Sequence, residues 1–423
     1  MMDRARSGAP LTIFSARGDG SFLLNGTSLD QILLASHVRN KPVVLVSVAG
    51  PFRKGKSFLL NFFILYLRNQ CRRDWLKESG APLGGFSWRG GSQRETTGIL
   101  LWSEVFLVTT PQGKEIAVVL MDTQGTFDIK STMKECTTFF ALSTMLSSVQ
   151  IYNLSQNIQE NDLQHLRLFC DYGRLAQKDV NEAPFQKLIF LIRDWSYPYE
   201  AEYGEVGGRR KLNDWLATSD CQNGELKGLR EDLKSYFNDI ACFLMPHPGL
   251  KVATDPEFQG QLSDIDSGFK EQLLKLVALI LAPQNLTTKK INGREITCEQ
   301  LRKLFEVYSD KFHQGNLPSP MSLREAIGVE NNLTASKDAL EHYNCRMNQF
   351  CRGGYRSENE FRSGHEERRA TALHVFDSTL KLGGKELEKR YRDKLVEDIE
   401  RKFSDYIRYN EDQKPADTFC LLF

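Results

Sequence analysis

The sequence predicts an α/β domain with a mostly parallel, doubly wound sheet, followed by a small all-α helical bundle. Short apolar and β-branched runs, typical of buried parallel strands, alternate with segments of helical apolar spacing through most of the chain. Beyond a polar segment at 283–298 the strand patterns vanish, and helical periodicity with mixed charges continues. We therefore expect an α/β domain at 1–282, a linker at 283–298, a helical bundle at 299–412 and a tail at 413–423.

Composition excludes several classes of protein. Of the 423 residues, 41% are hydrophobic and 26% are charged, as in soluble globular proteins with an ample core. The 55 basic residues nearly balance the 54 acidic ones, so nucleic acid is not expected as a partner. No apolar run approaches the roughly 18 residues that a transmembrane helix needs, and the nine cysteines include no C-x-x-C pair. We therefore expect a chain of the reducing cytosol with no transmembrane segment, zinc or disulfide.

The first elements are expected at one edge of the sheet. Apolar patterns predict short strands at 11–14 and 22–24, around a glycine-containing turn. Ser28 is a good N-cap residue for a helix that would run through Leu34.

The strongest pattern begins at Val43, where a strand, a loop and a helix follow one another. The loop fits G-x-x-x-x-G-K-[ST], and its residues are Gly50, Pro51, Phe52, Arg53, Lys54, Gly55, Lys56 and Ser57, with Phe58 opening the helix. In such a loop backbone N–H groups and the helix N-terminus bind phosphate. The lysine reaches the β- and γ-phosphates and the serine hydroxyl takes one Mg²⁺ position. The alternative, a chance match, is disfavoured because strand and helix are both in place.

A glycine-rich loop at 84–98 follows and ends in Thr96 and Thr97, just before a strand-like stretch at 99–108. Its position after the phosphate-binding loop is typical of a switch, in which a threonine closes over the γ-phosphate and Mg²⁺. The alternative interpretation is an ordinary linker.

The next strand, at 116–121, ends in Asp122-Thr123-Gln124-Gly125. Asp122 would hold Mg²⁺ through water, and the Gly125 N–H would contact the γ-phosphate. Taken with the upstream loop, this second motif indicates a nucleotide hydrolase.

The remaining pattern continues the alternation of strands and helices. We expect helices at 133–146, 160–175 and 220–237, and strands at 149–154, 187–192 and 241–245. Asp194 follows the strand at 187–192 and could accept hydrogen bonds from the N1–H and N2–H₂ of guanine, which adenine does not offer. The alternative is a surface ion pair with Arg193. The loop 246–249, which contains His247, would flank the base.

These motifs together resemble the atlastins, which are dynamin-superfamily GTPases related to guanylate-binding proteins. The resemblance spans about residues 12–410 and rests on the loop Gly50–Ser57, Phe86–Ser92, Glu95–Gly98, Met121–Gly125, Ser148–Leu154, Arg193–Trp195 and Pro246–Gly249. It implies a P-loop GTPase domain that hydrolyses GTP with Mg²⁺, and a nucleotide-dependent homodimer formed through that domain.

The resemblance also implies roles for particular residues. Arg53 resembles an arginine that folds back as a finger in cis, with Lys56 and Thr96 as its catalytic companions. The T-x-G spacing favours Thr96 over Thr97 for placing the attacking water, and Mg²⁺ would be held by Ser57, Thr96 and Asp122. The Arg193-Asp194 pair replaces the Asn-Lys-x-Asp of small GTPases.

The tail departs from the atlastin pattern, which continues into transmembrane segments. Cys420-Leu-Leu-Phe423 fits C-a-a-X, so Cys420 is a candidate for prenylation. An unmodified thiol, or an alternative end of a longer protein, is the other interpretation.

Two functions follow. The first is a GTPase that tethers or fuses membranes at the cytosolic face of the endoplasmic reticulum or another endomembrane. The second is a prenyl-anchored scaffold or regulator, similar to guanylate-binding proteins, that does not fuse membranes. Arg53, Thr96 and Asp122 disfavour a module that only binds nucleotide.

Overall fold

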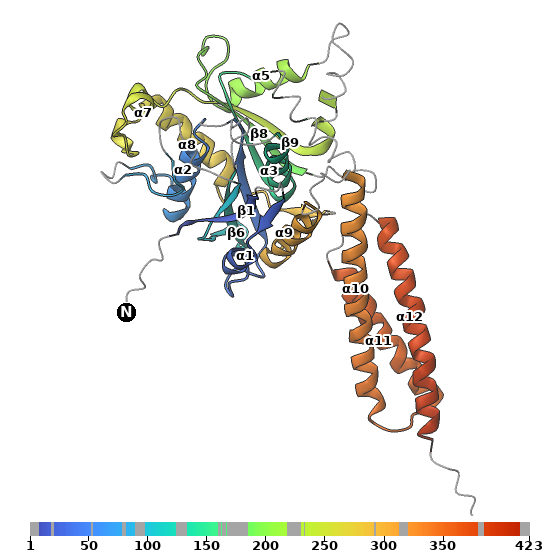
Figure 1. Cartoon of the computed structure of the whole chain (residues 1–423). Coiled ribbons are helices and arrows are strands. Elements are labelled where there is room, and N and C mark those ends of the chain that lie inside the picture. The colour runs from blue at the N-terminus through green and yellow to red at the C-terminus, as the bar shows by residue number, and fades with distance from the viewer. Residues whose placement is uncertain are drawn as a thin grey trace, which may run out of the picture. The chain divides into compact units, whose positions relative to one another are not determined.

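The computed structural model describes residues 8–17, 21–51, 54–77, 82–88, 98–123, 133–159, 162, 166, 185–217, 230–231, 233–291, 293–312, 320–379 and 385–414. The chain divides into two compact units, and each is considered by itself (Figure 1). The first comprises 1–177 and 181–320, and the second 178–180 and 321–423. Most of each predicted helix, at 160–175 and at 220–237, lies outside the described part of the chain. Six predicted site residues also lie outside it, namely Phe52, Arg53, Thr96, Thr97, Gly125 and Cys420.

The described part of the first unit is built on a nine-stranded sheet with strand order β2-β1-β4-β6-β3-β7-β8-β9, and β5 pairs with β6. β6, β3, β7, β8 and β9 run parallel, whereas β2, β1, β4 and β5 pair in antiparallel fashion. The bounds are β1 Pro10–Ala16, β2 Phe22–Leu24, β3 Val43–Ala49, β4 Ile99–Trp102, β5 Phe106–Thr109, β6 Glu115–Thr123, β7 Val149–Ser155, β8 Phe185–Arg193 and β9 Phe237–Leu244. The predicted α/β class is confirmed, and β1 and β2 lie at the expected edge.

Helices cover both faces of the sheet. Val44, Val46 and Val48 of β3 share one core cluster with residues of α2 and α8. Because side chains alternate along a strand, Val43 and Leu45 point to the opposite face. There α3 contacts β3 and β6, and α9 contacts α1 and α3. In its described part, the first unit has the helices α1 Gly26–Leu33, α2 Lys56–Arg68, α3 Met133–Leu146, α5 Glu205–Leu216, α7 Leu250–Thr254, α8 Ser267–Leu281 and α9 Cys298–Phe312, with a 3₁₀ turn η1 at Leu262–Asp264.

Three local features differ from expectation. Asn25, rather than Ser28, is the N-cap of α1, because its side chain accepts a hydrogen bond from the Ser28 N–H at 3.1 Å. The strand-like stretch at 99–108 is two strands, β4 and β5, each paired with β6. Helix α5 was not predicted, since its glycines suggest a loop. Gly208 is needed there because a Cβ would lie 2.2 Å from the Cys242 carbonyl oxygen, so the helix packs directly on β9.

The boundary between the two units lies further along the chain than the linker expected at 283–298. Residues 290–295 form a hairpin of β10 Lys290–Ile291 and β11 Arg294–Glu295, and helix α9 then packs on the first unit. Phe305 of α9 stacks on Phe14 of β1 at 6.0 Å, and Arg302 pairs with Asp30 of α1 at 2.6 Å. Helix α9 therefore belongs to the first unit, and the helical bundle begins after it rather than at 299.

The second unit consists, in its described part, of α10 Pro320–Cys351, α11 Glu358–Ser378 and α12 Lys385–Asp412. Its core contains small residues of α10 together with aromatic residues of all three helices. Ser357 and Glu360 form a capping box at the start of α11. The predicted helical bundle is confirmed. In the described part of the chain, every helix is too short or too polar to cross a membrane.

Candidate active site

The loop after β3 leads into the N-terminus of α2. Every residue of β3 is buried, and the strand ends at Ala49, just before Gly50. Gly55 adopts a left-handed conformation at the N-cap of α2, with φ of 72°, and no side chain caps the helix. A helix N-terminus that carries no side-chain cap favours a phosphate as the acceptor for its first N–H groups.

Lys56 opens α2 and is 6% exposed. Its Nζ donates a hydrogen bond to the Pro51 carbonyl at 3.1 Å, across the loop. Burial lowers the pKa of Lys56 to about 8, although the nearby Asp122 carboxylate opposes the shift. An added anion in this loop would stabilise the ammonium form, as binding of phosphate requires.

Ser57 and Asp122 meet because β3 and β6 are adjacent and parallel, with Val48 opposite Asp122. The Ser57 Oγ donates to Asp122 Oδ2 at 2.5 Å. Thr123 fixes the end of β6 by donating from Oγ1 to the Val48 carbonyl at 2.8 Å. A hydroxyl and a carboxylate are the hard oxygen ligands that Mg²⁺ prefers, alongside phosphate oxygens and water. The described residues contain no group of three or more His, Cys, Asp or Glu that could hold a metal ion.

Arg193 lies against the same loop from the end of β8. A Cβ at Gly55 would stand 3.1 Å from Arg193 Nη1, and the guanidinium lies 5.4 Å from the centre of the Phe269 ring. Arg193 is 5% exposed, and its Nε and Nη1 have no hydrogen-bond partner among the described residues. Burial lowers the pKa of Arg193, and Asp194 opposes this shift. Of these two buried donors, Nη1 lies against the loop without a described acceptor.

Asp194 follows β8 with φ of 60°, a left-handed conformation that is uncommon outside glycine. Its Oδ2 accepts a hydrogen bond from the Ser155 hydroxyl at 3.4 Å, and its side chain is half-buried. This carboxylate therefore remains accessible at the carboxyl end of the sheet, where ligands of doubly wound folds bind.

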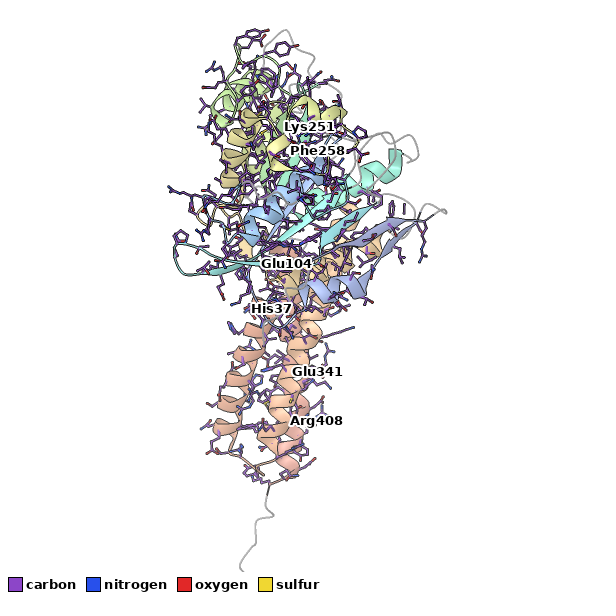
Figure 2. The ribbon with its side chains drawn as sticks, turned by 90° about the vertical axis from the view of Figure 1, so that its left-hand side faces the viewer. His37, Glu104, Lys251, Phe258, Glu341 and Arg408 are labelled. Carbon is purple, nitrogen blue, oxygen red and sulfur yellow. The ribbon has the colours of Figure 1, made fainter. Side chains whose placement is uncertain are left out.

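Two further residues that the sequence predicts for the site are His247 and Phe58. His247 is exposed, and its Nδ1 accepts from the Gly249 N–H at 3.1 Å, which shapes the loop after β9. The Phe58 side chain belongs to the core, where it packs with Phe62 and Trp88. The same cluster includes Phe258, which is labelled in Figure 2. Only the backbone of Phe58 could therefore contact a nucleotide.

The sequence did not single out two buried asparagines that support the site. Asn153 of β7 donates from Nδ2 to the Lys54 carbonyl at 2.8 Å. Asn61 of α2 bonds the Phe86 N–H at 2.7 Å and the Phe86 carbonyl at 3.0 Å, and so holds the start of the glycine-rich loop. Both are polar residues inside otherwise apolar runs, and that pattern could have identified them.

Comparison with known proteins identifies the family of the chain. The family model of the guanylate-binding protein N-terminal domain matches residues 19–290, and that of the guanylate-binding protein C-terminal domain matches 292–420. Atlastin-1 of Macaca fascicularis is 46% identical over 427 aligned positions, which cover 99% of this chain and 76% of that protein. Atlastin-2 of Homo sapiens and Atlastin-2 of Xenopus laevis are each 46% identical over 420 positions, covering 97% of this chain and 72% and 74% of those proteins.

The mixed sheet, the phosphate-binding loop and both family models define a dynamin-superfamily GTPase of the guanylate-binding type. It is an enzyme that hydrolyses GTP. Within that class, the near full-length identity to Atlastin-1 and Atlastin-2 shows that the chain belongs to the atlastin family.

Proposed function

We propose that this GTPase binds GTP and Mg²⁺ between the Gly50–Ser57 loop and the ends of β6 and β8. The contact of Ser57 with Asp122, beside the buried Lys56, carries the proposal. It places a hydroxyl, a carboxylate and a cation at the N-terminus of a helix. Those are the groups that a metal–triphosphate needs.

Each residue has one role in this proposal. Lys56 contacts the β- and γ-phosphates, and Ser57 and Asp122 hold Mg²⁺, directly or through water. The metal would supply positive charge to the phosphate oxygens. Asp194 accepts from guanine N1–H and N2–H₂, and Arg193 lies between the loop and the base. Contacts from Thr96 or Thr97, Gly125 and His247 remain predictions.

Hydrolysis is proposed to depend on Arg53 acting as a finger in cis. An arginine that offsets transition-state charge on the phosphates is worth about 10³ to 10⁵ in rate. We further propose that nucleotide-dependent self-association through the GTPase domain brings this residue into action. The 46% identity to Atlastin-1 over 99% of the chain supports the assignment.

At the cellular level we propose that the dimer tethers or fuses membranes of the endoplasmic reticulum. To distinguish fusion from tethering, the chain would be attached to liposomes through its C-terminus. Lipid mixing and content mixing between these liposomes would then be measured. Tethering without content mixing would favour the scaffold function instead. Prenylation of Cys420 stays a prediction.

GTP turnover measured against protein concentration tests the mechanism. We expect turnover per molecule to rise with concentration, to be absent with ATP, and to fall about 10³-fold in Arg53→Ala. The exposed Arg209 of α5, which pairs with Glu205 on its own helix, offers a matched control. Arg209→Ala should leave turnover within about twofold.

A different outcome would reject the finger mechanism. Turnover that is independent of concentration and equal in Arg53→Ala would leave a nucleotide-gated scaffold as the better explanation. Equal turnover with ATP and GTP would contradict the proposed role of Asp194 in recognising guanine.

A further inference from the structure

Asn153 lies on β7 beside the start of the phosphate-binding loop. β3 and β7 pair from Val46 opposite Val149 to Ala49 opposite Tyr152. Asn153 is the next residue of β7, at the point where β3 passes into the loop at Gly50. Its place in the sheet thus puts it next to the catalytic loop, although it is far from that loop in sequence.

Two contacts join Asn153 to opposite limbs of the loop. Its Nδ2 donates to the Lys54 carbonyl at 2.8 Å, a bond between residues 99 positions apart. Its own carbonyl oxygen would stand 2.2 Å from a Cβ at Gly50, where φ is 144°. Only glycine fits at Gly50, and the close approach holds the first limb against β7 while the side-chain bond holds the second.

The side chain of Asn153 is completely buried, and its Oδ1 has no hydrogen-bond partner among the described residues. Burying an amide group costs free energy unless the amide forms hydrogen bonds. The Nδ2 group of Asn153 forms its hydrogen bond with the loop. A residue whose purpose was to fill space would do so better with an apolar side chain. The geometry thus favours a role in holding the loop.

We propose that Asn153 is a positioning residue for GTP hydrolysis. By holding the Lys54 carbonyl it fixes the backbone that leads into Gly55 and Lys56, and with it the N–H groups at the start of α2. Catalysis of phosphoryl transfer rests on positioning and electrostatics, so a small displacement of this backbone affects the transition state more than nucleotide binding.

The test compares kcat and KM for GTP in the full chain and in Asn153→Leu, which keeps the branched side chain with the same number of heavy atoms and removes the donor. We expect kcat to fall by about 10- to 100-fold, since a misplacement of about 1 Å can cost about 10² in rate. KM and the Kd for a fluorescent GDP analogue should stay within about threefold. The Tm without nucleotide should fall by only a few degrees.

Gln150 provides a matched control on the same strand. It is buried, and its Oε1 accepts from the hydroxyls of Ser143 and Ser147 instead of contacting the loop. Gln150→Met should leave kcat within about twofold while lowering Tm to a similar degree. Asn153→Ser, which keeps a shorter donor, should lie between Asn153→Leu and the unmodified chain.

Three results would overturn the inference. They are an unchanged kcat in Asn153→Leu, a loss of GDP-analogue affinity as large as the loss of kcat, and an equal loss of kcat in Gln150→Met. If Asn153→Leu does not fold, Asn153→Ser is judged by the same criteria.

Discussion

Lys56 and Lys289 are both buried, and burial lowers the pKa of each because an ammonium group loses hydration. The pKa of Lys56 falls to about 8 beside Asp122, whereas that of Lys289 falls to about 7 with no opposing charge. Lys56 faces a loop where phosphate can restore its charge. Lys289 donates to the carbonyls of Met145 at 2.8 Å and Ser147 at 2.9 Å, at the C-terminal end of α3. Lys289 thus caps a helix, whereas for Lys56 we propose binding of phosphate.

The lowered pKa of Lys289 predicts a pH-dependent stability. Between about pH 7 and the ordinary lysine pKa of 10.5, the unfolded chain binds a proton at this residue that the folded chain does not. The free energy of unfolding therefore rises with pH in this window, by at most about 1.4 kcal/mol per pH unit. Lys289→Met removes this contribution and also the two hydrogen bonds to α3. Chemical denaturation at several pH values between about 7 and 9.5 measures this effect. The free energy of unfolding of the unmodified chain should increase with pH relative to that of Lys289→Met.

The neighbouring Lys290 is exposed and gives the control for this measurement. The difference in unfolding free energy between Lys290→Met and the unmodified chain should stay constant across the same pH range. A constant difference for Lys289→Met as well would show that Lys289 keeps its proton in the folded state.

The three helices of the second unit are joined by a polar contact inside their core. The Tyr343 hydroxyl of α10 and His365 Nδ1 of α11 are 2.8 Å apart, and both side chains are buried. The His365 ring stacks on Phe403 of α12 at 3.7 Å, and Nε2 lies 3.5 Å from Glu400 of the same helix. Burial lowers the pKa of His365, and Glu400 opposes the shift. The contact lies inside the core and joins α10, α11 and α12.

Tyr343→Phe should therefore destabilise the second unit without changing its fold. The substitution keeps the ring and leaves His365 Nδ1 buried without its partner, at an expected cost of about 1–3 kcal/mol in unfolding free energy. Denaturant unfolding followed by circular dichroism measures this loss. Tyr409 is 49% exposed, so Tyr409→Phe should change stability by less than about 0.5 kcal/mol. Equal effects of the two substitutions would contradict a bonded role for the buried hydroxyl.

The molecule as a whole has two compact units with separate hydrophobic cores, one between the sheet and α2 and α8, the other among α10, α11 and α12. All described nucleotide-site residues belong to the first unit. A ligand stabilises only the unit that binds it, by about 2.7 kcal/mol at a concentration 100 times its Kd.

Thermal unfolding should thus show two transitions that respond differently to nucleotide. GDP with Mg²⁺ is expected to raise the Tm of one transition by several degrees and to leave the other unchanged. Calorimetry of the full chain with and without nucleotide makes the measurement, and Lys56→Ala should abolish the shift. One transition that moves as a whole would mean that the units unfold together.

Sequence patterns predicted the parts of this protein that depend on neighbouring residues. The strand before Gly50, the left-handed Gly55 and the helix from Lys56 are adjacent in the chain, so periodicity and motif spacing identify them. The same holds for Asp122 at the end of β6. Helix α5 was missed because it is polar and glycine-containing, and only its packing on β9 stabilises it.

Contacts between distant residues could not be predicted in this way. Nothing in the local pattern indicates that Asn153 bonds Lys54, that Arg193 lies against Gly55, or that Lys289 caps α3. The same limit explains why α9 was assigned to the bundle: its periodicity is that of any amphipathic helix, and the choice of surface depends on its fit to Phe14 and Asp30. Periodicity and loop chemistry act within a few residues, whereas burial and long-range hydrogen bonds depend on which elements the folded sheet brings together.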